Sequence, residues 1–232
     1  MRAAVPVMPD SPQQVTEPVT LFGHWICPYS VRVEFMLAHL DLRYETIEVP
    51  PTAARPKGFV VPVEFVANSP KGEIPMIRTD GRYLSDSLPI LDFLNPLETP
   101  AARDAARWVD TTVFPPMIGV YYGTDATKIQ RAADALNNAL GELEIRLASA
   151  DWLAGTEPTM AEAALVPLYV RLDGLRALGF NAVLPRRVHE HAARVLDLPA
   201  GRKVQWSAEQ TEEFIWRLST YRERSQRRTG ID

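Results

Sequence analysis

The stretch of sequence that decides the fold runs from residue 19 to residue 37 and reads VTLFGHWICPYSVRVEFML. The segment from Val19 to Gly23 is short and mainly apolar and is bounded by Pro18 and Gly23, which is typical of a buried strand. Pro28 then stands where a helix can begin, because proline is tolerated in a first helical turn. The stretch therefore predicts a first strand and a helix that starts beside Cys27.

The residues that follow indicate further strands and helices in alternation. The segment YETIEV is rich in strand-forming side chains. Asp80-Gly81 lies between two short strand candidates, and this dipeptide is a strong signal for a hairpin. Ser85 or Asp86 can cap a later helix, whose apolar residues recur at helical spacing. The expected strands span 19–23, 44–49, 76–79 and 82–85, and the expected helices follow residue 28, span 63–68 and follow residue 86.

The order β-α-β-α-β-β-α is that of a thioredoxin-type α/β unit, and an all-helical pattern comes after it. Apolar residues from Ile129 to Leu147 recur at spacings of three and four, which predicts an amphipathic helix. Thr159 to Glu162, TMAE, is a capping-box signal for another helix. We therefore predict a flexible leader at 1–18, a thioredoxin-like domain at 19–95 and an all-helical domain at 101–226.

The composition excludes several classes of protein. With 46% hydrophobic residues and a net charge of -4, the chain is typical of a globular protein and gives no electrostatic case for nucleic acid. The Arg-rich stretch at 222–228 is interpreted as a solvated helix end. Cys27 is the single cysteine, so an intramolecular disulfide is impossible. No apolar run reaches 18 residues and the leader lacks a signal-peptide core, so we expect a cytoplasmic protein without a membrane span.

The segment Cys27-Pro28-Tyr29-Ser30 is the first candidate for chemistry. A thiol between a strand and a helix start feels the positive end of the helix dipole and nearby free amides, which stabilise a thiolate. Ser30 stands where a two-cysteine redox centre has its second thiol, so a mixed disulfide at Cys27 must be resolved by an outside thiol. The alternative is an inert buried cysteine, but the strand-CxxS-helix context favours a functional position.

Two further elements of the sequence are candidates for a functional site. Proline directly before a strand, as in Ile74-Pro75, is a candidate cis bond, although the sequence alone leaves the isomer open. Asp86-Ser87 at a helix start offers a carboxylate, a hydroxyl and free backbone amides, which together suit a zwitterionic amino-acid group. A plain trans proline and a plain helix cap are the alternative interpretations.

Taken together, these elements resemble the glutathione S-transferase superfamily. The segment SPKGEIP at 69–75 is similar to the family's Asn-Pro-x-Gly-x-Val-Pro segment, with Ser69 in place of the asparagine. The segment LSDSLPIL at 84–91 is similar to its Glu/Asp-Ser element. The capping-box region of the family's helical domain resembles residues 152–165, where Glu162 replaces an aspartate. The resemblance covers about residues 19–178, and the stretch at 198–206 fits no pattern of the family.

Within the superfamily, CPYS is similar to the cysteine-type members: the omega, lambda, dehydroascorbate-reductase-like and related bacterial enzymes. The resemblance implies that Cys27 forms a mixed disulfide with glutathione or lies beside its sulfur. It also implies that Ile74, next to a cis Pro75, pairs its backbone with the cysteinyl part of glutathione. Asp86 and Ser87 would hold the γ-glutamyl end. Glutathione is then the co-substrate, no metal is needed, and a homodimer is a family expectation.

In this fold a second substrate would lie between the domains. Trp108, Met117, Tyr121 and Tyr122 are candidates for its pocket, since aromatic and methionine side chains suit an adaptable apolar site. Each of them is equally well interpreted as a packing residue. His24 precedes Cys27 and is a candidate to tune the thiolate.

Three functions remain open at this level. The first is a glutathione-dependent transferase or thiol transferase that acts through Cys27 on a small hydrophobic or disulfide substrate by exchange, cleavage, isomerisation or conjugation. The second is a non-catalytic interaction or stress protein that retains the fold. The third is a conjugating transferase in which Ser30 or a tyrosine activates the thiol. An intact set of Cys27, Ile74-Pro75 and Asp86-Ser87 favours the first.

Overall fold

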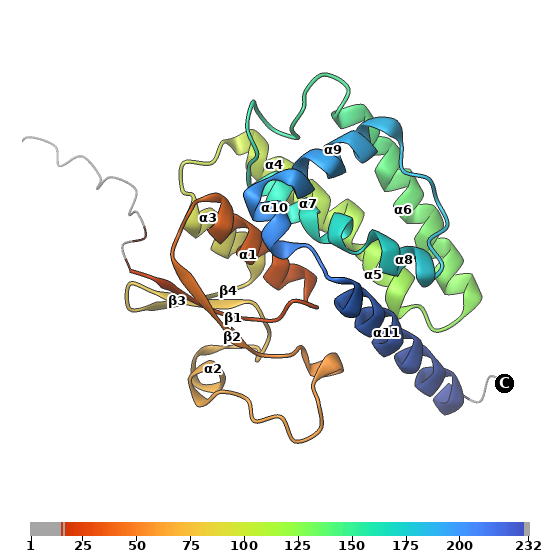
Figure 1. The fold of residues 1–232 in the computed structure, drawn as a ribbon, viewed down its shortest axis with the longest axis horizontal. Coiled ribbons are helices and arrows are strands. Elements are labelled where there is room, and N and C mark those ends of the chain that lie inside the picture. Colours follow the sequence, from red (N-terminus) through yellow and green to blue (C-terminus); the bar gives the residue numbers. More distant parts are fainter. Residues whose placement is uncertain (1–14, 16, 230–232) are drawn as a thin grey trace, which may run out of the picture.

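The computed structural model describes residue 15 and residues 17–229 of the chain (Figure 1). The predicted leader at 1–18 therefore lies almost wholly outside the described residues. Its last part is tied to the sheet, because the Thr79 hydroxyl donates to the Glu17 carbonyl at 3.2 Å. The Glu17 amide in turn donates to Asp80 Oδ1 at 3.2 Å.

The N-terminal region is built on a four-stranded mixed sheet in the order β2-β1-β3-β4. The strand β1 pairs in parallel with β2, whereas β1 with β3 and β3 with β4 are antiparallel pairs. The hairpin predicted around Asp80-Gly81 is confirmed, with Asp80 and Gly81 both at positive φ in the turn. The strands are β1 (Val19–Gly23), β2 (Tyr44–Glu48), β3 (Met76–Thr79) and β4 (Arg82–Ser85).

Helices cover both faces of this sheet because its central strands are apolar on both sides. Leu21 and Ile77 face the main core, whereas Phe22 and Met76 face a smaller cluster that includes Phe65. Figure 1 shows α1 and α3 on one side of the sheet and α2 on the other. Their bounds are α1 (Pro28–His39), α2 (Val63–Asn68) and α3 (Ser87–Leu94), with a 3₁₀ turn, η1 (Thr52–Ala54), before α2.

The rest of the described chain is helical, as the apolar spacing predicts. A π-helical segment lies directly ahead of Pro115 and Pro116, which lack the N–H groups that a regular helix needs. The elements are α4 (Pro100–Trp108), η2 (Val109–Val113), α5 (Phe114–Tyr122), α6 (Ala126–Arg146), α7 (Met160–Val170), α8 (Leu172–Ala177), α9 (Arg186–Asp197), α10 (Pro199–Val204) and α11 (Ala208–Thr229). The predicted fold class, a thioredoxin-like α/β part followed by an all-helical part, is confirmed.

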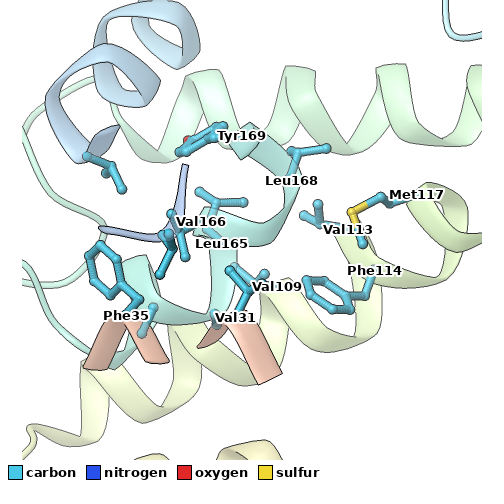
Figure 2. Packing of buried hydrophobic residues seen from close by; sticks show 14 of the residues in the cluster. Val31, Phe35, Val109, Val113, Phe114, Met117, Leu165, Val166, Leu168 and Tyr169 are labelled. Atoms are coloured by element: carbon cyan, nitrogen blue, oxygen red, sulfur yellow. The ribbon is translucent and has the colours of Figure 1, made fainter. Parts of the chain in front are cut away.

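The two parts share one continuous hydrophobic core. Side chains of α1 (Val31 and Phe35), of the α4–α5 segment (Val109) and of α7 (Leu165 and Val166) gather in a single cluster (Figure 2). Helix α1 packs against both α7 and α10. The segment 198–206, which fits no family pattern, thus supplies α10 as part of this junction.

The capping box predicted at the start of α7 is present. The Thr159 amide donates to Glu162 Oε2 at 2.7 Å, and the Thr159 hydroxyl accepts from the Ala161 amide at 3.2 Å. The Leu153 amide donates to Glu162 Oε1 at 2.7 Å, so the buried carboxylate also fixes the preceding loop. Within residues 15 and 17–229, the structure contains no helix that is long and apolar enough to span a bilayer.

Candidate functional site

A cleft of about 920 Å³ lies where the sheet domain meets the helical domain. Its lining brings together residues that are far apart in the sequence, from the start of α1, the loop before β3, the start of α3, and the helices α5 and α11. The sequence-predicted residues that line it are Cys27, Ile74, Pro75, Asp86, Ser87, Tyr121 and Tyr122. Most of the predicted set therefore shares a single cavity.

Cys27 is the N-cap residue of α1. Its backbone is extended, with φ -79° and ψ 118°, and Pro28 begins the helix directly after it. Only 6% of Cys27 is exposed, and its Sγ lies 3.8 Å from the carbonyl oxygen of Ile74. The Ile74–Pro75 peptide bond is cis. The single thiol thus lies at the cleft wall, where the α1 dipole presents its positive end.

Asp86 and Ser87 form a second corner of the site, at the start of α3. Asp86 has φ 71°, a region that favours glycine, so its backbone is held in a strained conformation. Its side chain does not cap the helix but extends to the exposed Lys71, with 3.5 Å between Oδ2 and Nζ. The first N–H groups of a helix have no partner inside it. Ser87 therefore brings both an amide and a hydroxyl to the cleft.

Arg32, in α1, is fully buried and fixes the Ser87 side chain. Its Nη1 donates to Ser87 Oγ at 3.2 Å and to Asp110 Oδ1 at 2.6 Å, while its Nε donates to the Ala164 carbonyl at 3.2 Å. The guanidinium also lies 3.5 Å from the ring centroid of Phe114. Burial lowers the pKa of Arg32, and the hydrogen bond and charge of Asp110 oppose that effect. Arg32 thereby joins the corner at Ser87 to the helical domain.

Arg171, at the end of α7, is a second fully buried arginine and was missed by the sequence analysis. Its Nη2 donates to the Ile26 carbonyl at 2.8 Å and its Nη1 to the Pro167 carbonyl at 3.0 Å. No carboxylate in the described part of the chain pairs with it, and its Nε has no hydrogen-bond partner there. Burial lowers the pKa of Arg171 to about 10, while Tyr121 and Cys27 act to raise it. A single arginine directly after the apolar run of α7 is the signal that could have marked it.

His24 is an unsuitable source of positive charge beside the thiol. The Ile26 amide donates to its Nδ1 at 3.2 Å, so this nitrogen acts as an acceptor. Burial lowers the pKa of His24, although the charge of Glu48 opposes this. The imidazole is therefore neutral near pH 7, and the sequence-level hypothesis that it tunes a thiolate by charge receives no support.

The helical wall of the cleft differs from the set expected for an acceptor pocket. Tyr121 and Tyr122 line the cleft, but Met117 is fully buried in the core. Trp108 carries the Arg146 guanidinium 4.2 Å from its ring centroid, and it does not belong to the cleft lining. Residues of α11, which the sequence alone did not predict for the site, complete this wall: Phe214, Trp216, Arg217, Leu218, Thr220, Tyr221 and Arg224. Helical periodicity alone does not tell which face of a terminal helix meets a ligand.

The loop between β2 and α2 closes the cleft on one side. Arg55 in this loop donates from Nε and Nη2 to the Pro50 carbonyl, each at 3.3 Å. Arg217 of α11 reaches across and donates to the Ala54 carbonyl at 2.7 Å. The loop therefore brings a cation to the cleft and is tied to the C-terminal helix. In the part of the chain that the structure describes, no three side chains of the metal-binding types cluster together.

Comparisons with known proteins agree with this architecture. Residues 26–97 match the model of the glutathione S-transferase N-terminal domain, and residues 126–197 match the model of the C-terminal domain. A search of curated proteins found no match.

Several solved structures are similar in fold. Rice GST1, solved in complex with glutathione, is 20% identical with a TM-score of 0.75, covering 89% of this chain and 97% of that one. The tau class glutathione S-transferase from mango, Mangifera indica, is 19% identical with a TM-score of 0.72, covering 86% of this chain and 98% of that one. The Omega 3C enzyme from Trametes versicolor is 19% identical with a TM-score of 0.70, covering 92% and 94%.

Proposed function

Because the chain belongs to the glutathione S-transferase superfamily, we propose that it is a glutathione-dependent thiol transferase that acts through Cys27 on a small organic or disulfide substrate. The observation that carries the proposal is the position of the thiol. The chain's single cysteine occupies the N-cap position of α1, at the wall of the cleft that Ile74 and Ser87 also line. The rice relative that was solved with glutathione supports this ligand.

The chemistry of the cleft fits the three parts of glutathione. The γ-glutamyl carboxylate would meet the Ser87 amide and hydroxyl, and Asp86 would take the ammonium group. The exposed Asp86–Lys71 ion pair is weak enough to give way to a ligand. The cysteinyl backbone would pair with Ile74, which brings the ligand sulfur toward Cys27. Arg55 would then face the glycyl carboxylate.

Thiol exchange at this site needs no group beyond glutathione itself. The Cys27 thiolate attacks the glutathionyl sulfur of a mixed disulfide, so a Cys27–glutathione disulfide forms and the substrate thiolate leaves and takes up a proton. A second glutathione thiolate then attacks that disulfide, which releases oxidised glutathione and restores the Cys27 thiolate. In both steps the sulfur of Cys27 lies at the positive end of the α1 dipole.

Activation of glutathione by Ser30 is disfavoured as an alternative. Ser30 is 2% exposed and does not belong to the cleft lining, so its hydroxyl is not available to a ligand sulfur. Tyr29 does line the cleft, but burial raises the pKa of its phenol, although the charge of Arg32 opposes this. Tyr29 therefore loses its phenol proton less readily there than a tyrosine in water does.

Glutathione binding tests the proposal directly. Calorimetry on the wild type, Cys27→Ala and Asp86→Ala is combined with intact-mass analysis after incubation with oxidised glutathione. We expect a glutathione adduct on the wild type and on Asp86→Ala but not on Cys27→Ala, and weaker binding to Asp86→Ala. Absence of both binding and adduct at millimolar ligand would overturn the proposal and favour a non-catalytic interaction protein.

We also propose that the protein forms a homodimer. Exposed valines on α2 and just before it, Val60, Val63 and Val66, leave an apolar surface on the sheet domain. Light scattering after size exclusion measures the mass, and Val63→Glu should shift a dimer to the monomer. A monomeric wild type at micromolar concentration would contradict this part of the proposal.

A further inference from the structure

One face of α11 is directed into the cleft. Arg217, Tyr221 and Arg224 are spaced by four and three residues, which places them on the same side of a helix, and all three line the cavity. On another side, Arg222 donates to the carbonyls of Val120 and Leu178 and so anchors the helix to the domain. The interpretation of residues 222–228 as a solvated helix end is therefore wrong for Arg222.

The two arginines that face the cleft differ in how far their hydrogen-bonding groups are already used. Arg217 is half-buried, pairs with Glu213 and is tied to the Ala54 carbonyl, so its bonding capacity is largely used. Arg224 is exposed and has no hydrogen bond or ion pair with any residue of the described chain. It lies seven residues beyond Arg217, about 10 Å farther along the helix. A cation of this kind in a cavity wall is available to an anionic ligand.

The surface beside Arg224 is aromatic. The rings of Tyr122 and Tyr221 meet edge to face, with 5.3 Å between their centroids. Each residue is more than a third exposed, and both line the cleft. Burial raises the pKa of Tyr122, and the charge of Cys27 adds to this, so its phenol stays neutral and can donate a hydrogen bond. A planar ring would find contact area on both tyrosines.

We propose that the acceptor substrate of this site is a small aromatic carboxylate, with its ring against Tyr122 and Tyr221 and its carboxylate on Arg224. The inference rests on the proposed function, because it assumes that glutathione occupies the other end of the cleft. In the proposed binding mode the two carboxylates of glutathione lie at Ser87 and Arg55, so Arg224, which also lines the cleft, remains for a third anionic group. The planar guanidinium favours a carboxylate because it can bind both oxygens.

Calorimetry with a matched pair of probes, 4-nitrobenzoate and 4-nitrobenzamide, tests this proposal. The pair differs in charge and little in shape, and each probe is titrated with and without saturating glutathione. The variants are Arg224→Gln and the control Arg227→Gln, which removes an exposed arginine that pairs with Glu223 and does not line the cleft.

We expect the wild type to bind the benzoate at least tenfold more tightly than the amide, since hydrogen bonds to charged groups have this magnitude. Arg224→Gln should remove the difference and Arg227→Gln should retain it. Equal binding of both probes to the wild type, or an unchanged preference in Arg224→Gln, would overturn the inference. Glutathione binding to Arg224→Gln is measured separately, so failure of the glutathione site is distinguished from failure of the acceptor site.

Discussion

The junction between the domains buries two arginines, and their charges are treated in opposite ways. Arg32 meets the carboxylate of Asp110, the hydroxyl of Ser87 and the Ala164 carbonyl. Arg171 donates to the carbonyls of Ile26 and Pro167 and lies 4.7 Å from the ring centroid of Trp206, but no carboxylate of the described chain pairs with it. A buried cation without a counter-ion is costly. The junction therefore holds one arginine whose charge is balanced by a carboxylate and one whose charge is not, and the second interacts electrostatically with Cys27.

Loss of Arg32 should have the largest effect. Arg32→Met leaves the Ala164 carbonyl without its buried donor and Asp110 without its counter-ion. Breaking a buried pair in this way costs about 3–5 kcal/mol, and we expect the lower end because Asp110 is 35% exposed. Urea unfolding measures the change. Arg176→Met, which removes an exposed pair with Asp173, should cost less than about 1 kcal/mol and serves as the control. An equal loss of unfolding free energy in the two variants would contradict the structural role assigned to Arg32.

Replacement of Arg171 should change reactivity more than stability. Arg171→Met removes an unpaired buried charge while it leaves two carbonyls unsatisfied, so these effects on the free energy of unfolding partly cancel. The rate of Cys27 alkylation by iodoacetamide at pH 7 should fall on the order of tenfold, because a nearby positive charge is lost. Arg171→Lys, which retains the charge, should recover most of that rate. A folded Met variant that reacts like the wild type would show that Arg171 is structural only.

A third buried charge, Glu162, extends the comparison to acid pH. Burial acts to raise its pKa, but His191 and the amides of Leu153 and Thr159 prevail, so the pKa of Glu162 is lowered. A group whose pKa is lower in the folded state stabilises the fold above its unfolded value of about 4.3. That contribution is lost as the pH falls through the folded value.

Urea midpoints measured between pH 6 and pH 3 should therefore show a stability loss below about pH 4.3 that is smaller in Glu162→Gln than in the wild type. At pH 7 the same variant should lose about 1 kcal/mol, the usual value of a helix cap. Parallel acid profiles for the two proteins would mean that Glu162 does not contribute to the loss.

Asp110→Asn should have the smallest effect, and it makes Arg32 resemble Arg171. The amide oxygen can still accept from Arg32, but the negative charge is lost. Although Arg32 is buried, we expect a cost of less than about 1 kcal/mol, because the charge of the partly exposed Asp110 is screened by solvent and the guanidinium keeps its hydrogen-bond acceptors. Addition of 0.5 M salt should narrow the difference from the wild type, because screening weakens the charge of Asp110. A loss as large as that of Arg32→Met would mean that the charge of Asp110, rather than the hydrogen bonds of Arg32, dominates the cluster.

Local sequence signals identified most of the fold and part of the candidate site. The hairpin at Asp80-Gly81 and the capping box from Thr159 to Glu162 are set by interactions between residues close in sequence, so the sequence alone predicts them. The same holds for the thiol of Cys27, whose position follows from a strand and a proline-started helix on either side. Trp108 and Met117 show the limit, because an apolar residue of a helix faces either a core or a cleft with the same periodicity.

The sequence by itself determined the order of strands and helices, the absence of a second thiol and the position of Cys27 at a helix start, since each depends on covalent order or on neighbours within a few residues. Only the tertiary structure decided that Arg171 meets the Ile26 carbonyl, 145 residues earlier in the chain. It also decided that Arg224 of α11 shares a cavity with Cys27. The physical reason is that the charge state and exposure of a side chain depend on everything packed around it. The neighbours of Arg171 include a residue of the other domain, and those of Arg224 depend on how α11 lies across the cleft.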